Sequence, residues 1–180
     1  MEDAYGVKKV DSADSVDVHT VFRLASLSKT FASFLSAMLV EEQYFGWDDP
    51  VVDYLPEFRL KNTSSTDQLT IRHVLSQTTG LPRHAYTKLV EEGMSNEDMI
   101  RALGEVEVIA RPGEFYSYQN VAYSLIESIA RAATGASYTA LLTEKVLNPL
   151  GMNDASVNFH DLIVNDNHAT PHVGSAKGLR

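Results

Sequence analysis

The chain of 180 residues contains no cysteine, and this absence excludes several kinds of chemistry. Without a thiol there is no disulfide, no thiolate metal site and no cysteine nucleophile. The chain also lacks an excess of positive charge, because its formal net charge is −9 and its Lys and Arg residues form no cluster. A general nucleic-acid binder would carry a basic patch, so we expect no nucleic-acid partner.

Long apolar runs and an export signal are also missing. No run approaches the roughly 20 apolar residues that a membrane-spanning helix needs, so we expect no membrane span. The start, Met1-Glu2-Asp3-Ala4, is acidic, which predicts no signal peptide and leaves the cellular location open. The content of 44% hydrophobic and 22% charged residues predicts a packed core, in one domain or in a large piece of a bigger one.

The first part of the chain predicts two short strands and a long helix. Residues 4–10 and 21–24 have the pattern of strands around a polar turn. Between Ser26 and about Tyr44, apolar residues recur at helical spacing and predict one buried face, made of Leu27, Phe31, Phe34, Leu35, Met38 and Leu39. Two short strands do not form an independently stable sheet, so we expect their partners to be supplied from elsewhere.

Capping signals predict two short helices in the middle of the chain. Thr70 precedes an apolar pattern over residues 71–77 and is placed to cap that helix. Ser95 and Asp98 have the spacing of a capping box and open a second helix.

Two more helices are predicted after residue 120. The first ends at Gly135, because glycine commonly terminates a helix, and the second is capped by Ser137. The polar stretch 61–67 is predicted as a loop. The last 30 residues, from Gly151, hold few apolar side chains and are predicted as irregular.

Ser26 and Lys29 form the pattern S-x-x-K where the helical apolar run begins. Residues three apart on a helix are neighbours, with about 5–6 Å between Cβ atoms, so the two side chains are able to share a proton. A serine hydroxyl is a weak nucleophile near neutral pH and needs such a base. With 16 serines and 7 lysines in 180 residues, about 0.6 matches arise by chance, so the pattern gains meaning only from its context.

That context is a set of blocks which together resemble the serine β-lactamase-like family, a group that includes class C β-lactamases, DD-peptidases and related esterases. The blocks appear in the family's order within about residues 4–173. They are VFRLASLSKT at 21–30, WDDPV with YLP at 47–56, IRHVLSQTTGLP at 71–82, PGE with YQN at 112–120, and NPLGM at 148–152.

The resemblance implies a fold class of α/β, α+β type, with the β-lactamase/transpeptidase-like architecture. The chain would be a helix-rich fragment that holds the helical domain and part of the α/β domain. Within this single partial domain, residues 1–45 would form the nucleophile edge, 46–155 the mainly helical part and 156–180 an irregular tail.

The resemblance also implies roles for four residues. In the family, the serine of S-x-x-K is acylated and the lysine is its partner, which carries over to Ser26 and Lys29. The Y-x-N element matches Tyr118-Gln119-Asn120. Its tyrosine assists proton transfer and its asparagine positions substrate and lysine, so Tyr118 is the expected third catalytic residue and Asn120 the substrate-binding one.

General chemistry is compatible with these roles. Free lysine and tyrosine have pKa values near 10, so neither is a useful base at neutral pH without a perturbation. Burial or a second nearby cation lowers the pKa of a lysine. The start of a helix at Ser26 would contribute roughly half a positive charge, which favours an alkoxide and later the oxyanion.

The family's third element, a strand bearing K-T-G or H-x-G, has no convincing match. His172-Val173-Gly174 fits the loose pattern, and Ala176-Lys177-Gly178 contains Lys-Gly, but neither follows a strand-like run. Because loss of one oxyanion donor typically costs about 10²–10³ in rate, we expect this chain by itself to be weakly active or inactive.

The expected function is that of a serine hydrolase of the β-lactamase or penicillin-binding type. It would form an acyl-enzyme through Ser26 on a β-lactam, a D-alanyl peptide or an ester, without a cofactor. The alternative is a non-catalytic remnant or binding module that keeps the scaffold. A third possibility is that a second chain completes the sheet, since an exposed sheet edge favours self-association.

The histidines do not predict a metal site. His168 and His172 are four residues apart, but they and His160 lie in a segment predicted as irregular rather than helical, so we expect no metal there. His19 and His84, like His73, are interpreted as surface or structural residues.

Overall fold

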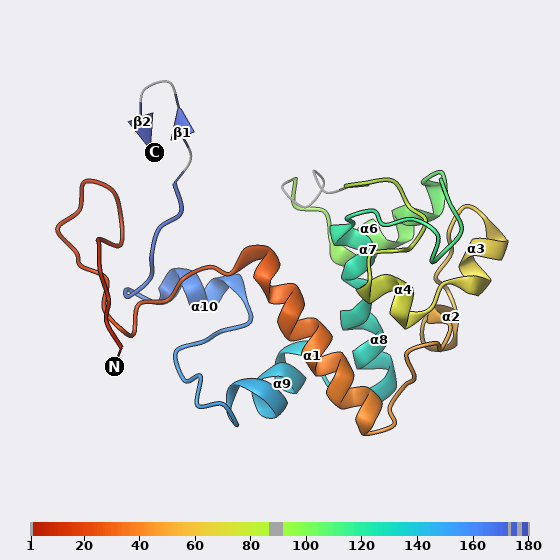
Figure 1. The fold of residues 1–180 in the computed structure, drawn as a ribbon, viewed down its shortest axis with the longest axis horizontal. Coiled ribbons are helices and arrows are strands. Elements are labelled where there is room, and N and C mark those ends of the chain that lie inside the picture. The colour runs from red at the N-terminus through yellow and green to blue at the C-terminus, as the bar shows by residue number, and fades with distance from the viewer. Residues whose placement is uncertain (1, 87–91, 173, 176–177, 180) are drawn as a thin grey trace. The chain divides into compact units, whose positions relative to one another are not determined.

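The computed structural model describes residues 2–86, 92–172, 174–175 and 178–179 (Figure 1). They form two compact units. One unit contains Met1–Phe31 and Leu141–Arg180, and the other contains Ala32–Ala140. The predicted division at residues 45 and 155 stays a prediction.

The unit of residues 32–140 is built from helices. Its core consists of side chains that are at most 1% exposed, among them Leu35, Leu39, Val51, Leu69, Ile71, Val74, Leu81, Leu103, Leu125 and Ile129. Its elements include most of α1 (Ser28–Glu41), then α2 (Val51–Tyr54), α3 (Thr63–Gln68), α4 (Ile71–Leu75), α6 (Asn96–Ala102), the 3₁₀-helix η2 (Leu103–Glu105), α7 (Asn120–Tyr123), α8 (Leu125–Thr134) and the start of α9 (Tyr138–Leu142).

The predicted caps are present. The Thr70 side chain accepts a hydrogen bond from the His73 backbone N–H, and the His73 ring accepts one from the Thr70 N–H, which together make a capping box for α4. Ser95 caps α6 by accepting from the Asp98 N–H. Gly135 ends α8 with φ of +75°, the left-handed conformation that glycine adopts most cheaply.

The prediction of a polar loop at 61–67 is wrong, because α3 occupies most of it. Asn62 caps this helix by accepting a hydrogen bond from the Ser65 N–H. Thr66 is buried and its hydroxyl bonds with the backbone of Leu60. A buried threonine with bonded polar atoms stabilises a helix that composition alone does not reveal.

The long helix predicted from Ser26 to about Tyr44 is shorter and begins differently. A 3₁₀ turn, η1 (Ala25–Leu27), precedes α1, which ends at Glu41. The buried residues of α1 are Ala32, Leu35, Ser36 and Leu39, whereas Leu27 and Phe34 are exposed. The predicted buried face is therefore correct at Leu35 and Leu39 and wrong at Leu27 and Phe34.

The unit of residues 1–31 and 141–180 has little regular structure. It contains η1, the end of α9, the π-helix η3 (Thr143–Leu147), α10 (Phe159–Val164) and a two-stranded antiparallel pair, β1 (Gly174–Ser175) with β2 (Gly178–Leu179). The tail predicted as irregular thus contains a helix and a short strand pair, and Asn158 caps the helix by accepting from the Asp161 N–H.

The two predicted N-terminal strands appear only as single bridges. Val7 pairs with Ser15, and Val21 pairs in parallel with His168. The Val21 N–H donates to the Asn167 carbonyl, and the Val21 carbonyl accepts from the Ala169 N–H. Among the described residues, neither predicted strand pairs beyond its single bridge. Such short isolated pairings are at best marginally stable.

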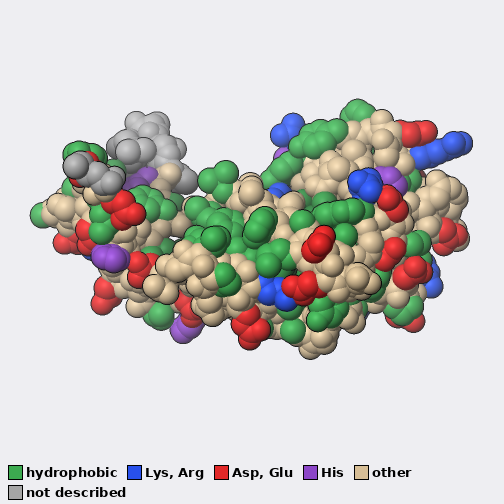
Figure 2. Space-filling view, turned by 60° about the horizontal axis from the view of Figure 1, so that its bottom comes forward, with side chains coloured by type: hydrophobic (Ala, Val, Ile, Leu, Met, Phe, Trp, Pro, Cys, Tyr) green, Lys and Arg blue, Asp and Glu red, His purple; other side chains and the backbone are tan. Residues whose placement is uncertain are grey.

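Figure 2 shows hydrophobic side chains at the surface of one face, with acidic side chains between them. In the unit of residues 1–31 and 141–180, exposed large apolar side chains include Phe22, Leu24, Leu27, Phe159, Ile163 and Val164. Among the helices that the structure describes, none combines the length and the apolar sequence that a membrane span requires.

Candidate active site

Ser26 lies in the middle of η1, immediately before α1. The residue before it, Ala25, has φ of +48°, a left-handed conformation that side chains other than glycine rarely adopt. The Leu27 N–H donates to the Leu24 carbonyl at 3.1 Å and closes the turn. This tight turn directs the chain into the helix while Ser26 stays exposed.

Lys29 lies in the first turn of α1, three residues after Ser26, and is half-buried. Both residues therefore occupy one continuous helical stretch, as the S-x-x-K spacing predicts. The first N–H groups of a helix have no partner within it, and the macrodipole adds roughly half a positive charge at this end. A developing negative charge near Ser26 is favoured by that field.

Tyr118 and Asn120 belong to the other unit and lie at the start of α7. Asn120 is the first residue of this helix, and both side chains are half-buried. The Tyr118 ring meets the His84 ring edge to face, with centroids 5.6 Å apart and planes at 64°. Tyr118 and Asn120 thus lie together in the unit of residues 32–140, and Ser26 and Lys29 lie together in the unit of residues 1–31 and 141–180.

Two glutamines surround Tyr118 and were not singled out by the sequence patterns. Gln119 is fully buried, and its N–H donates to Oε1 of Gln77 at 2.8 Å. The Gln119 amide nitrogen donates to the Pro82 carbonyl. Gln77 lies 42 residues before Gln119, and no local pattern connects two residues that far apart.

Ser33 and Tyr123 make a second contact that the sequence does not predict. The hydroxyl of Ser33 on α1 and the phenol of Tyr123 on α7 are 2.8 Å apart. Burial raises the pKa of Tyr123, so its phenol stays protonated over the ordinary pH range. This hydrogen bond ties α1 to α7 inside the unit of residues 32–140.

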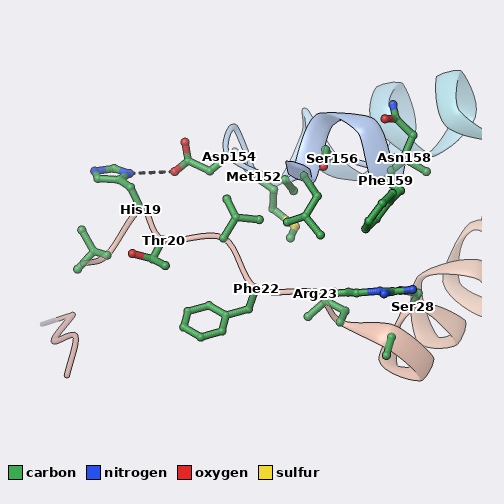
Figure 3. A pocket seen from close by; sticks show the side chains of 17 residues that line it. His19, Thr20, Phe22, Arg23, Ser28, Met152, Asp154, Ser156, Asn158 and Phe159 are labelled. Carbon is green, nitrogen blue, oxygen red and sulfur yellow. Dashed lines mark hydrogen bonds and ion pairs between the residues drawn. The ribbon is translucent and has the colours of Figure 1, made fainter. Parts of the chain in front are cut away.

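A groove of about 620 Å³ lies in the unit of residues 1–31 and 141–180, between the segments 18–28 and 152–162 (Figure 3). At one end the His19 ring and the Asp154 carboxylate are 2.9 Å apart. Toward the other end, the Arg23 guanidinium lies 5.6 Å from the centroid of the Phe159 ring. Ser28 also lines this groove.

The two candidates for the third element lie at the short strand pair, because Gly174 begins β1 and Gly178 begins β2, although neither follows a strand-like run in the sequence. Nε2 of His172 accepts a hydrogen bond from the Val10 N–H at 3.1 Å, which occupies that ring nitrogen. Val173, Ala176 and Lys177 lie outside the described residues. In the described part of the chain, no group of three His, Asp or Glu side chains could hold a metal ion.

Sequence comparison finds relatives that are longer than this chain. Protein flp of Staphylococcus aureus strain N315 is 29% identical over 154 residues, which is 84% of this chain and 31% of that protein. Unguisins hydrolase ungD of Aspergillus violaceofuscus is 28% identical over 169 residues, which is 89% of this chain and 30% of that protein. The chain thus spans about a third of the length of these relatives.

Solved structures share the fold. The octameric penicillin-binding protein homologue from Pyrococcus abyssi matches with a TM-score of 0.83 and 25% identity over 98% of this chain and 42% of that one. EstCE1, a hydrolase with promiscuous acyltransferase activity, matches with a TM-score of 0.81 and 25% identity over 99% of this chain and 49% of that one. These matches confirm the predicted β-lactamase/transpeptidase-like fold and its helix-rich character.

A family model supports the same assignment from the sequence side. The model described as Beta-lactamase matches residues 1–179, which is nearly the whole chain. The resemblance that rested on five short blocks is therefore confirmed over the full length, and the chain belongs to the beta-lactamase family.

Proposed function

We propose that this chain carries the nucleophile of a serine acyl-transfer hydrolase. The coarse assignment rests on the family, whose matches here include proteins described as a hydrolase, a hydrolase with promiscuous acyltransferase activity and a beta-lactamase/D-alanine carboxypeptidase. The finer assignment rests on one observation. Ser26 and Lys29 share one helical start, directly after the left-handed Ala25.

In the proposed reaction, Ser26 attacks the carbonyl carbon of the substrate. Its proton passes to Lys29 as the proposed base, with Tyr118 in the assisting role that the family pattern gives it, and a new Oγ–C bond gives a tetrahedral oxyanion. The C–N or C–O bond then breaks, and the leaving group takes the proton. Water attacks the resulting acyl-enzyme, the Oγ–C bond breaks, and the free acid and the serine hydroxyl are restored.

Asn120 has the proposed role of holding the substrate and Lys29 in position. Its amide offers two donors and one acceptor, which suits a peptide-like or lactam carbonyl. The substrate class that follows is a β-lactam, a D-alanyl peptide or a simple ester, because all three react through one acyl-enzyme mechanism. No metal or cofactor is needed for these steps.

Covalent labelling of Ser26 tests the proposal without requiring turnover. The protein is incubated with a fluorescent penicillin or a fluorophosphonate, and the labelled residue is located by peptide mass spectrometry. We expect label on Ser26, loss of label in Ser26→Ala and strong slowing in Lys29→Met, because the base is removed.

Ser28→Ala is the matched control, because Ser28 is an exposed serine on the same turn. It should label like the unchanged protein. Absence of label from a chain with a folded circular dichroism spectrum would instead favour the non-catalytic remnant or binding module. Label that persists in Ser26→Ala would show that another residue is the nucleophile.

We also propose that the chain self-associates through exposed apolar surface. Phe22, Leu24 and Leu27 are exposed near the single bridge at Val21. Because no ladder continues from this bridge, the backbone next to it can pair with a strand of a second chain. Sedimentation velocity over a series of protein concentrations would show a rising mass. A mass equal to that of one chain at all concentrations would refute this proposal.

A further inference from the structure

We propose that Gln77 positions Tyr118 by acting as its strand partner, an inference that rests on the proposed role of Tyr118. Gln77 follows α4 and is only 6% exposed, so its amide group is directed into the protein rather than into water. Gln119, the residue after Tyr118, is fully buried. The two residues thus meet in a part of the unit where unpaired polar groups are costly.

Gln77 accepts hydrogen bonds from both residues that flank Tyr118. The Ser117 N–H donates to the Gln77 backbone carbonyl at 2.9 Å, and the Gln119 N–H donates to the Gln77 Oε1 at 2.8 Å. N–H groups two residues apart in an extended chain point to the same side. One glutamine therefore supplies two successive acceptors, the second of them from its side chain, as a neighbouring strand would.

The opposite edge of the same segment is also held. The Tyr118 carbonyl accepts from the His84 N–H at 3.0 Å, and the rings of the two residues are in contact. The Gln119 side-chain amide donates to the Pro82 carbonyl. Tyr118 is thus fixed through its two neighbours on one side and through its own carbonyl on the other.

The segment that provides these partners is itself held by backbone hydrogen bonds. The Thr78 N–H donates to the His73 carbonyl at 2.9 Å, and the Thr78 carbonyl accepts from the Gly113 N–H at 2.8 Å. Gln77 has φ of +60°, a conformation that its surroundings must maintain, and its carbonyl and side chain both accept from the segment 117–119. A displacement of about 1 Å at a catalytic group costs up to ~10²-fold in rate, so this support has a functional consequence.

A double-mutant cycle tests the inference. Gln77→Met keeps the length of the side chain and removes its acceptor, whereas Gln77→Glu keeps an acceptor oxygen in either protonation state. The rate of Ser26 labelling by a fluorophosphonate is measured in the unchanged protein, in Gln77→Met, in Tyr118→Phe and in the combined variant. Gln68→Met is the control, because Gln68 is an exposed glutamine on α3.

If Gln77 acts through Tyr118, Gln77→Met slows labelling by about 10–100-fold, and the combined variant is no slower than Tyr118→Phe. Gln77→Glu restores most of the rate, and Gln68→Met has no effect. The inference would be overturned if the losses of labelling rate in the two single variants multiplied in the combined variant. It would also be overturned by a Gln77→Met labelling rate within about twofold of that of the unchanged protein.

Amide hydrogen exchange separates this inference from the proposed function. In Gln77→Met the amide of Gln119 loses its side-chain acceptor and should exchange at least about tenfold faster, and in Gln77→Glu it should stay protected. The amide of Ser117 is the internal reference, because its acceptor is the Gln77 backbone carbonyl, which both variants keep. Lack of Ser26 label in the unchanged protein would sink the proposed function alone, while the exchange rates would still support the anchor. Unchanged exchange at the Gln119 amide in Gln77→Met would refute the anchor, whether or not Ser26 is labelled.

Discussion

Gly80 should be the glycine whose replacement by alanine costs most, and Gly135 provides the matched comparison. Both adopt left-handed backbone, with φ of +82° at Gly80 and +75° at Gly135. A Cβ at Gly80 would lie 2.2 Å from the backbone carbonyl oxygen of Ala110, whereas a Cβ at Gly135 would meet nothing within 4 Å. The two substitutions therefore share the conformational strain and differ in the steric clash.

The magnitudes follow from these two contributions. Left-handed backbone costs a residue with a Cβ about 1–2 kcal/mol, and loss of unfolded-state freedom returns roughly 0.4–1 kcal/mol. Gly135→Ala should therefore lower the free energy of unfolding by about 1 kcal/mol. At Gly80 the clash with backbone adds about 2 kcal/mol, since a main-chain carbonyl must move.

Thermal unfolding followed by circular dichroism measures the difference. At roughly 3 °C per kcal/mol for a chain of this size, Gly135→Ala should lower the melting temperature by about 3 °C and Gly80→Ala by about 9 °C. The Gly80 carbonyl accepts from the Ile109 N–H, so exchange at that amide should rise in Gly80→Ala only. Equal shifts for the two variants would refute the reasoning, because the clash would then cost nothing.

Two further predictions concern a helix cap and an ion pair. Thr70→Ala should destabilise the protein by about 1 kcal/mol in urea unfolding, and Thr70→Ser should stay close to the unchanged protein, because serine keeps the capping oxygen; equal losses would contradict this. The pKa of His19 is raised, chiefly by its hydrogen bond with Asp154, so the pair's contribution is present below about pH 6.5 and is lost as the pH rises through the raised pKa. An NMR titration should show a lower His19 pKa in Asp154→Asn, and an unchanged value would rule out the ion pair.

Local signals explain which parts of the fold are predictable from the sequence. The caps at Thr70 and Ser95 and the helix end at Gly135 depend on residues within four positions of each other, and the structure confirms all three. The helix α3 was missed because its Ser, Thr and Asp content is typical of loops. What stabilises it is the buried Thr66, whose burial depends on packing that composition does not report.

The candidate site divides in the same way. Ser26 and Lys29 are proposed from the sequence because three residues of helix set their spacing, and Tyr118 and Asn120 are proposed from the family pattern. The sequence does not predict the support of Tyr118 by Gln77, because 42 residues separate Gln77 from Gln119 and their contact exists only after α4 and α7 have packed.

Positive φ recurs beside the candidate residues in each of the two units. Six residues other than glycine have positive φ in the described part of the chain. Ala25 immediately precedes Ser26, Gln77 bonds to both neighbours of Tyr118, and His84 contacts Tyr118 itself. Each such conformation costs about 1–3 kcal/mol and persists only where the surroundings enforce it. Glycine would relieve that strain at Ala25 and Gln77, but a glycine at residue 77 would also remove the side-chain acceptor for Gln119. The strained backbone at residue 77 thus occurs together with the side-chain contact to Gln119, the residue after Tyr118. This combination is the physical basis for assigning Gln77 a positioning role.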